Sequence, residues 1–249
     1  MMSWPEGVER RVLDSVDSTN AEAARIADSL AGPCWIMARR QTAARGRRGR
    51  AWASPEGNFA ATLVLRPAEA PGQAALRSFV AALALRETCA GLTGREAAFS
   101  LKWPNDVLLN GGKLAGILLE SVGAGGRLTH LAIGIGVNLT AVPPPEAVEP
   151  GATPPVALAP ETGIRPGQEA FLDALAAAYA RWEYQFTTYG FAPIRSAWLA
   201  HAARLGQPIT ARTARETHEG TFETVDETGA LVLNGPRGRV AIPAAEVFF

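Results

Sequence analysis

The feature that most constrains the fold is a run of three expected strands between residues 98 and 139, with no helical pattern between them. The stretches AFSLKWPNDVLL, KLAGILLESV and RLTHLAIGIGVNL have the apolar, β-branched character of strands. The first two are joined through Asn110-Gly111-Gly112, a strong hairpin signal because the central turn positions tolerate a positive φ. The run therefore predicts strands that neighbour one another in a sheet.

The segments on either side of this run alternate between strand and helix patterns. A capped amphipathic helix should follow the first strand, since Thr19 and Glu22 have capping-box spacing and Gly32 lies just past its end. A long buried helix should be closed by Gly91. Strands are expected at residues 10–16, 34–38 and 58–67, helices at 19–32, 72–92, 169–189 and 193–203, and a partly ordered proline- and glycine-rich loop at 141–168.

After Gln207 the spacing of apolar residues changes to two, which predicts four or five short strands. A segment of this size suits a small barrel of the SH3-like type. The chain is therefore expected to have two parts, a mixed α/β domain at residues 1–206 and a β-module at residues 207–249.

The charge balance argues against a dedicated nucleic-acid-binding protein. Lysine plus arginine and aspartate plus glutamate number 24 each, so the chain lacks a global basic field. Cys34 and Cys89 are isolated, which indicates neither a zinc site nor a disulfide framework and favours core thiols in a reducing compartment. The sequence has no secretory leader pattern and no apolar window of membrane-spanning length, so we expect a soluble, cytoplasmic protein with no membrane partner.

The arginine loop, residues 39–50, contains six arginines interrupted by Gly46 and Gly49. It can be interpreted as a solvated basic loop or as an RNA-binding patch of the arginine-glycine kind. Glycine beside arginine also lets backbone N–H groups and guanidinium forks converge on one phosphate or carboxylate. A nucleic-acid face would usually interleave exposed aromatic residues with the arginines, and here only Trp52 follows. The flanks therefore favour an anion site.

Of the 24 basic residues only Lys102 and Lys113 are lysines, and both lie within residues 101–120. Lysine is a flexible point charge rather than a rigid fork, so its placement is informative. In KWPND, an Asn-Asp pair just after a buried strand can hold an adenine, a ribose or a metal-bound phosphate. In GKLAG, the missing side chain of Gly116 would let a ligand lie against the backbone.

The segment DSTN, residues 17–20, lies at an expected junction between a strand and a helix. It is adequate as a helix N-cap. The hydroxyls of Ser18 and Thr19 could equally hold the polar head of a small ligand at the edge of the sheet.

Taken in order, DSTN, QTAARGRRGRAW, KWPND, GKLAGILLE and GIGVNL resemble the motifs of the biotin protein ligase family, over about residues 8–140. The resemblance is specific as an ordered set. It implies the mixed-sheet, class II synthetase-like catalytic domain of biotin and lipoate ligases, followed by an SH3-like β-barrel. It also implies ATP-dependent formation of biotinyl-5′-adenylate with release of pyrophosphate, then transfer of biotin to one lysine of a biotin carboxyl carrier domain of a carboxylase.

The resemblance also assigns roles to side chains. The catalytic residues would be Lys113 and Arg47, with Lys113 stabilising the charge that builds in the transition state. Mg²⁺ would accompany ATP, no protein ligand of a metal is assigned, and a homodimer is compatible with the family. The biotin side would contain Ser18, Thr19, Asn20, Gln41, Arg45, Gly46, Arg47, Lys113 and Gly116. The ATP side would contain Arg47, Arg48, Trp52, Lys102, Asn105, Asp106, Lys113 and Asn138.

Three departures from the family pattern affect these expectations. The family usually reads Gly-Arg-Gly-Arg-Arg-Gly, and Ala44 replaces the first glycine. Its C-terminal module commonly directs an arginine at ATP shortly after the position of Glu246, where this chain stops, so Arg237 or Arg239 would have to replace it. We expect residues 207–249 mainly to dock the carrier domain and brace the active-site loops. The chain also starts at the catalytic strand, without the helix-turn-helix repressor domain of some members, so neither DNA binding nor transcriptional regulation is expected.

Two alternatives stay open at this point. Lipoate or octanoate attachment uses catalytic domains of similar fold, although the Arg-Arg-x-Ser-Gly-Gly-Gly run that would favour it is absent. An arginine-glycine RNA-binding module predicts salt-sensitive RNA binding without pyrophosphate release, and the charge balance argues against it.

Overall fold

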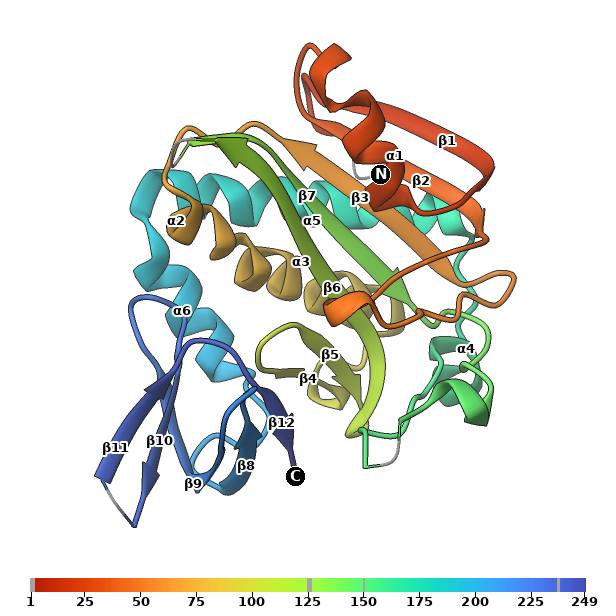
Figure 1. Cartoon of the computed structure of the whole chain (residues 1–249). Helices are drawn as coiled ribbons and strands as arrows, with labels where there is room; N and C mark the ends of the chain where they lie inside the picture. The colour runs from red at the N-terminus through yellow and green to blue at the C-terminus, as the bar shows by residue number, and fades with distance from the viewer. Residues whose placement is uncertain (1–2, 125–126, 150, 237) are drawn as a thin grey trace.

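The computed structural model describes residues 3–124, 127–149, 151–236 and 238–249. Its main sheet has seven strands: β1 (Glu9–Val16), β2 (Cys34–Gln41), β3 (Phe59–Leu65), β4 (Phe99–Lys102), β5 (Asp106–Leu109), β6 (Gly112–Ala124) and β7 (Arg127–Val137). Their order is β1-β2-β3-β7-β6-β5-β4 (Figure 1). Because β1 is parallel to β2 and the other neighbouring pairs are antiparallel, the sheet is mixed, as predicted.

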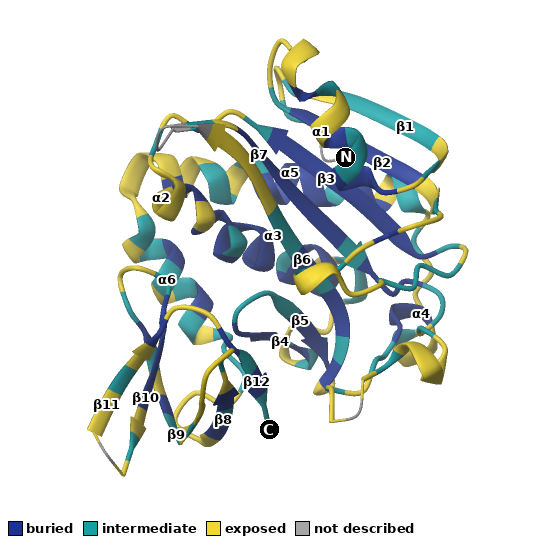
Figure 2. Ribbon diagram, in the orientation of Figure 1, coloured by how far each residue is buried: buried dark blue, intermediate teal, exposed yellow. Residues whose placement is uncertain are grey.

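Helices cover both faces of this sheet. The helices are α1 (Thr19–Ile26), α2 (Pro71–Ala75), α3 (Arg77–Thr93), α4 (Leu158–Thr162), α5 (Gln168–Tyr189) and α6 (Phe191–Ala200). α3 and α5 pack side by side behind the strands and bury the main core, while α1 lies on the other face over a smaller core (Figures 1 and 2). Among the described residues, no helix combines the length and the apolar character that crossing a bilayer requires.

The predicted hairpin is confirmed. Asn110 and Gly111 have φ values of 51° and 82°, which the turn requires, and Leu109 pairs with Gly112 across it. The single strand expected at residues 98–109 is wrong, because the chain reverses at Trp103–Pro104 and forms β4 and β5, which pair with each other. Proline cannot donate a backbone hydrogen bond to a strand neighbour, which explains the break.

Two helix boundaries differ from the sequence predictions. The N-cap of α1 is Ser18 and not Thr19, and the capping box does not form because the Thr19 side chain turns toward β2 and β3. The helix after residue 72 ends at Gly94, whose φ of 68° is left-handed, and Gly91 lies within its last turn. Gly94, and not Gly91 as predicted, therefore adopts the left-handed conformation that commonly ends a helix.

A second, antiparallel sheet follows α6. Its strands are β8 (Pro208–Arg212), β9 (Thr217–Val225), β10 (Leu231–Gly235), β11 (Gly238–Ile242) and β12 (Glu246–Phe248), in the order β11-β10-β9-β8-β12. It packs directly on the main layer, since Trp103 Nε1 donates a 3.0 Å hydrogen bond to the Gly229 carbonyl and the rings of Trp198 and Phe222 lie 6.5 Å apart. This arrangement brings β12 toward the edge of the main sheet formed by β4 and β5 (Figure 1).

Candidate active site

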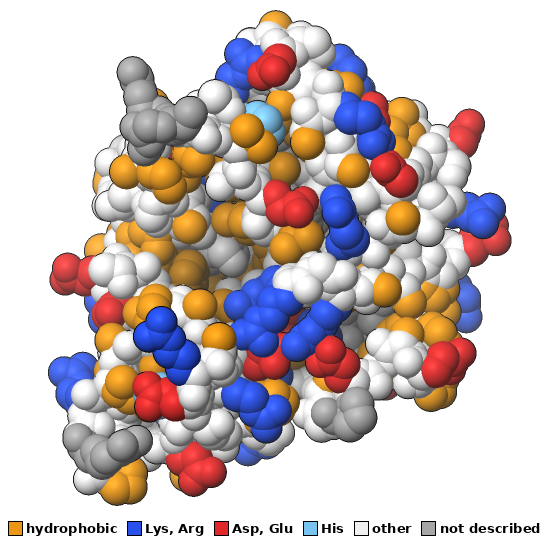
Figure 3. Space-filling view, viewed as in Figure 1, with side chains coloured by type: hydrophobic (Ala, Val, Ile, Leu, Met, Phe, Trp, Pro, Cys, Tyr) orange, Lys and Arg blue, Asp and Glu red, His pale blue; other side chains and the backbone are white. Residues whose placement is uncertain are grey.

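A pocket of about 700 Å³ lies where the arginine loop, strands β5 to β7 and strand β12 meet. Figure 3 shows basic side chains gathered next to acidic ones on this face, between the main sheet and the C-terminal strands. The pocket lining includes all the residues that the family resemblance assigned to the biotin and ATP sides: Ser18, Thr19, Asn20, Gln41, Arg45, Gly46, Arg47, Arg48, Trp52, Lys102, Asn105, Asp106, Lys113, Gly116 and Asn138. Segments far apart in sequence thus form one site.

One end of the pocket is lined by neutral polar side chains. Ser18, Thr19 and Asn20 lie where α1 begins, and Gln41 ends β2. Gln41 Oε1 accepts a 2.7 Å hydrogen bond from the backbone N–H of Thr19, which fixes the amide of Gln41 and leaves its Nε2 as a donor. Because donors and acceptors are fixed here, this end suits a ligand with a polar head.

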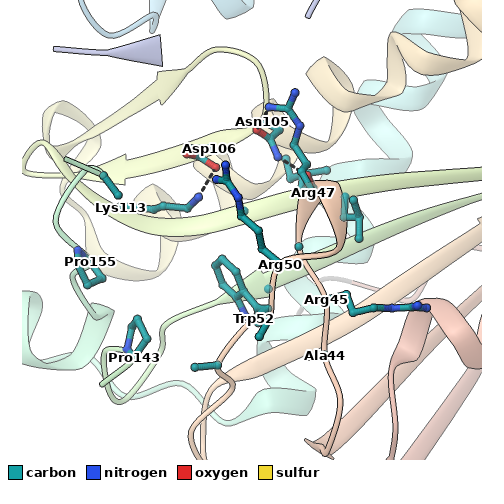
Figure 4. A pocket seen from close by; sticks show the side chains of 18 of the residues that line it. Ala44, Arg45, Arg47, Arg50, Trp52, Asn105, Asp106, Lys113, Pro143 and Pro155 are labelled. Carbon is teal, nitrogen blue, oxygen red and sulfur yellow. Dashed lines mark hydrogen bonds and ion pairs between the residues drawn. The ribbon is translucent and has the colours of Figure 1, made fainter. Parts of the chain in front are cut away.

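The two lysines lie elsewhere in the same pocket. Lys113 Nζ, on β6, lies 2.8 Å from Asp106 Oδ1 on the neighbouring β5 (Figure 4). Lys102 is 8% exposed, and its Nζ donates a 2.6 Å hydrogen bond to Thr153 Oγ1. Burial lowers the pKa of Lys102, and the charge of Asp106 opposes that shift. Asp106 is therefore a counter-charge near both lysines.

Arg47 is half-buried, whereas the other arginines of its loop are exposed. Its Nη1 lies 3.5 Å from Asn105 Oδ1, and Asn105 Nδ2 donates to the Ile117 carbonyl at 2.5 Å. Burial lowers the pKa of Arg47, and Asp106 opposes that shift as it does for Lys102. Cations from the arginine loop and from β6 thus surround one carboxylate, an arrangement that can receive phosphates.

The indole of Trp52 lies over two glycines of the sheet. A Cβ on Gly136 would approach Trp52 Nε1 to 2.8 Å, and one on Gly116 would approach Trp52 Cζ3 to 3.3 Å. Gly116 is the glycine expected from the sequence to let a ligand lie against the backbone, and in the structure Trp52 covers its open face. Lys113 Nζ lies 5.6 Å from the centroid of the same ring, within the range of a cation–π contact.

The amide of Asn138 is used within the protein. Its Nδ2 donates to the Val156 carbonyl at 3.1 Å, and its Oδ1 accepts from Asn58 Nδ2 at 3.4 Å. Asn138 therefore anchors part of the proline-rich loop, and its assignment to the nucleotide stays a prediction.

The arginine loop is tied to the C-terminal sheet by a carboxylate that sequence reasoning missed. Glu246 on β12 lies 3.4 Å from Arg48 and also pairs with Arg50. Arg50 Nε lies 2.9 Å from Glu149 of the proline-rich loop. Local sequence patterns cannot show that Glu246 contacts arginines about 200 positions earlier in the chain. The opposite charges of these residues were the only sequence signal for the contact. The contacts fit the bracing role expected of residues 207–249.

The backbone of this loop accommodates the departure at Ala44. Positive φ values occur at Arg48 (58°) and Gly49 (72°), and Ala44 is not among the described non-glycine residues with a positive φ. An alanine is therefore accepted at position 44 without left-handed strain. The Arg45 side chain extends away from Lys113 and Asp106 in Figure 4.

Of the two arginines expected as replacements toward ATP, the structure describes only Arg239. Arg239 lies on β11, pairs with Glu223 at 2.8 Å and does not line the pocket, because β11 and β12 are opposite edges of the second sheet. Arg237 lies outside the described residues. Arg212 on β8 does line the pocket, with its guanidinium carbon 4.7 Å from the centroid of the Phe248 ring.

Within the described ranges, no three His, Cys, Asp or Glu side chains are grouped closely enough to hold a metal ion. The carboxylates that line the pocket are Asp106, Glu146, Glu149 and Glu246. Such a site can accept an ion that arrives on a phosphorylated ligand, since Mg²⁺ is usually bound through one or two carboxylates together with substrate phosphates.

Two family models match the chain. Residues 12–138 match the Biotin/lipoate A/B protein ligase family, and residues 205–249 match the Biotin protein ligase C terminal domain. The first match contains the polar end, both lysines and the arginine loop. The second contains β12 and Glu246.

Comparison with individual proteins also finds biotin ligases. The chain is 59% identical over 238 residues to a biotin--[acetyl-CoA-carboxylase] ligase of Paracoccus denitrificans, covering 96% of this chain and 99% of that one. It is 31% identical over 230 residues to the bifunctional ligase/repressor BirA of Escherichia coli, covering 92% of this chain and 70% of the relative. The solved biotin protein ligase from Aquifex aeolicus in complex with biotin and ATP superposes with a TM-score of 0.80 at 26% identity, covering 96% of this chain and 97% of that one.

Proposed function

The chain belongs to the biotin/lipoate A/B protein ligase family, and on that premise we propose that it joins biotin to ATP and transfers the biotinyl group to a lysine of a biotin carboxyl carrier domain. In the first step a biotin carboxylate oxygen attacks the α-phosphorus. A mixed anhydride bond forms, the bond from the α-phosphorus to the oxygen bridging to the β-phosphate breaks, and pyrophosphate leaves with that electron pair. The products are biotinyl-5′-adenylate and pyrophosphate.

The polar end of the pocket is the observation that carries the choice of biotin. The ureido ring of biotin has N–H donors beside a carbonyl acceptor. At this end of the pocket Ser18 presents a hydroxyl, and the polar groups of Thr19 and Gln41 are held in place by hydrogen bonds to each other. The dithiolane ring of lipoate has no N–H group, so it would leave these polar groups without a ligand partner. For the buried side chains, Ser18 and Thr19, an unpaired polar group costs about 1–3 kcal/mol. We therefore assign Ser18, Thr19 and Gln41 to the ureido ring.

The cations of the pocket would act on the reacting groups. Lys113 would hold the biotin carboxylate against the α-phosphate and stabilise the charge that grows on the phosphoryl oxygens. Its partner in the structure is Asp106, and Arg47 lies 3.5 Å from Asn105, the residue before Asp106. Lys102, Arg47 and Arg48 would face the nucleotide, and the half-buried Arg47 would also keep water from the anhydride.

Mg²⁺ would enter bound to the ATP phosphates and neutralise part of their charge. Asp106 is the carboxylate nearest the two lysines, so it is the residue we propose to meet the ion.

In the second step the neutral amine of the carrier lysine attacks the biotinyl carbonyl carbon, an amide bond forms, and AMP leaves with the electrons of the anhydride bond. We propose that residues 1–206 carry both steps and that residues 207–249 brace the arginine loop and dock the carrier. We place the reaction in the cytoplasm, where ATP is available and where Cys34 and Cys89 would remain free thiols.

Isothermal titration with biotin, lipoate and RNA tests the substrate class, and pyrophosphate release tests the reaction. We expect biotin to bind and to be required for pyrophosphate release from ATP, while lipoate and RNA do neither. Release that depends on lipoate and not on biotin would establish the alternative ligase. RNA binding without pyrophosphate release would overturn the enzyme assignment.

A further inference from the structure

A fully buried threonine lies behind the polar end of the pocket. Thr62, on β3, is 0% exposed and is not among the residues that line the pocket. Its Oγ1 lies 2.8 Å from Thr19 Oγ1 and 2.6 Å from Asn20 Oδ1. Thr62 therefore contacts two candidate ligand-binding residues without being able to contact a ligand itself.

The amide of Asn20 has one orientation that its neighbours allow. Its Nδ2 lies 2.7 Å from Glu120 Oε2 and 3.4 Å from the Leu118 carbonyl, and both of these atoms can only accept. The NH₂ group must therefore face them, and Oδ1 must face Thr62. Gly134 provides the space, because a Cβ there would lie 2.3 Å from Asn20 Oδ1. Both ends of this amide are thus used within the protein.

A count of protons shows what Thr19 can offer a ligand. Three short oxygen contacts are linked in series: Thr62 to Asn20 at 2.6 Å, Thr62 to Thr19 at 2.8 Å, and Thr19 to Gln41 Oε1 at 3.1 Å. Only the hydroxyl protons of Thr62 and Thr19 are available for them. If Thr19 turned its proton toward a ligand, two of the three contacts would have no proton. The Thr19 proton is therefore directed inward, and the hydroxyl faces the pocket as an acceptor.

We propose that Thr62 is a positioning residue for the ligand ring. By holding the Thr19 proton inward, Thr62 makes the Thr19 hydroxyl an acceptor for a ring N–H, while Gln41 Nε2 donates to the carbonyl of the same ring. This inference rests on the proposed function and extends it to the way the ureido ring is distinguished. Asn20 then acts by holding Thr62 in place, with its own orientation set by Glu120, and does not need to contact biotin.

The test compares Thr62→Val with Thr62→Ser. Valine keeps the shape and removes the hydroxyl, which is the nearer inward partner of Thr19. The only inward acceptor left for the Thr19 proton is Gln41 Oε1 at 3.1 Å, so the proton turns more easily toward the pocket, where it opposes the ligand N–H. We expect the KM for biotin in pyrophosphate release to rise roughly five- to tenfold, the effect of one lost hydrogen bond, with kcat and the KM for ATP within about twofold of the wild type. Serine keeps the hydroxyl and loses a core methyl group, so it should restore the KM for biotin while lowering the melting temperature.

Thr88→Val is the matched control, because Thr88 is also a buried threonine, donates to the Ala84 carbonyl at 2.8 Å and lies outside the pocket. It should leave the KM for biotin unchanged. The role of Thr62 is refuted if Thr62→Val has a normal KM for biotin, if Thr62→Ser resembles Thr62→Val, or if Thr88→Val gives the same rise. A wild-type chain without biotin-dependent release would overturn the proposed function and this inference together. An active wild type with a normal Thr62→Val overturns this inference alone.

Discussion

Replacing Lys113 should separate catalysis from folding more cleanly than any other change in the pocket. Lys113→Ala removes the cation that we assign to the α-phosphate, and loss of one preorganised group of this kind typically slows a reaction about 10²- to 10³-fold, or about 2.7–4 kcal/mol. We expect biotin-dependent pyrophosphate release to fall by that factor. Lys113→Arg should not restore it fully, because a planar fork cannot follow the phosphorus centre as a point charge does.

The effect on folding should be much smaller. The side chains of Lys113 and Asp106 are 30% and 14% exposed, so their pair is partly screened by water, and pairs of this kind contribute about 1 kcal/mol or less. In Lys113→Ala the carboxylate of Asp106 would still face the positive charges of Lys102 and Arg47. Its interaction with both is visible in their pKa values, because the charge of Asp106 opposes the lowering of each. The structure therefore predicts a difference of about 2 kcal/mol or more between the catalytic and the folding effects.

The assay is single-turnover pyrophosphate release at saturating biotin and ATP, with urea unfolding of the same preparations. Arg10→Ala is the matched control, because it removes a cation of similar exposure whose ion pairs, with Glu169 and Asp173, lie outside the pocket. A Lys113→Ala rate within about threefold of wild type would refute the role of Lys113, and so would a Lys113→Arg rate equal to wild type. A loss of rate that only matches the loss of folded protein would assign Lys113 to stability.

Three further predictions concern the arginine loop. Trypsin cleavage within residues 39–50 should slow when biotin and ATP are added, because an anion then bridges like charges that otherwise repel; an unchanged digestion pattern with binding confirmed would indicate a static loop. Glu246→Gln should speed the same cleavage in the ligand-free protein, because it removes the charge paired with Arg48 and Arg50, and equal cleavage would show that the tie does not restrain the loop. Arg47→Gly should release adenylate and label lysines of bystander proteins, measured by streptavidin blotting, and labelling confined to the carrier would argue against a guarding role.

Short-range signals in the sequence predicted much of the fold. The turn at Asn110 and Gly111 could be located because few residues tolerate two successive positive φ values, and the turn fixes the register of the strands beside it. The break between β4 and β5 was missed because apolar runs lie on both sides of it, although Pro104, Asn105 and Asp106 are all residue types that favour turns. The end of α3 was misplaced because Gly91 and Gly94 look alike until the backbone angles are known.

The candidate site was predictable as a set of motifs and not as a set of contacts. The motifs identify Lys113 and Asp106, and the pairing of β5 with β6 determines that they meet. Glu246 could not be predicted in this way, because its contact with the arginine loop depends on how the second sheet packs on the first. The role of Thr62 was hidden for a similar reason, since a single threonine within an apolar strand gives no signal before α1 is placed over it.

The direct test of the central claim is to incubate the wild-type chain with biotin, ATP, Mg²⁺ and a biotin carboxyl carrier domain, and to map the product by peptide mass spectrometry. Our account predicts biotin on one lysine of the carrier, in a reaction that requires ATP and releases AMP and pyrophosphate. Replacing biotin by lipoate should give no product. An unmodified carrier under conditions where both ligands bind, or a carrier that is lipoylated instead, would contradict the account.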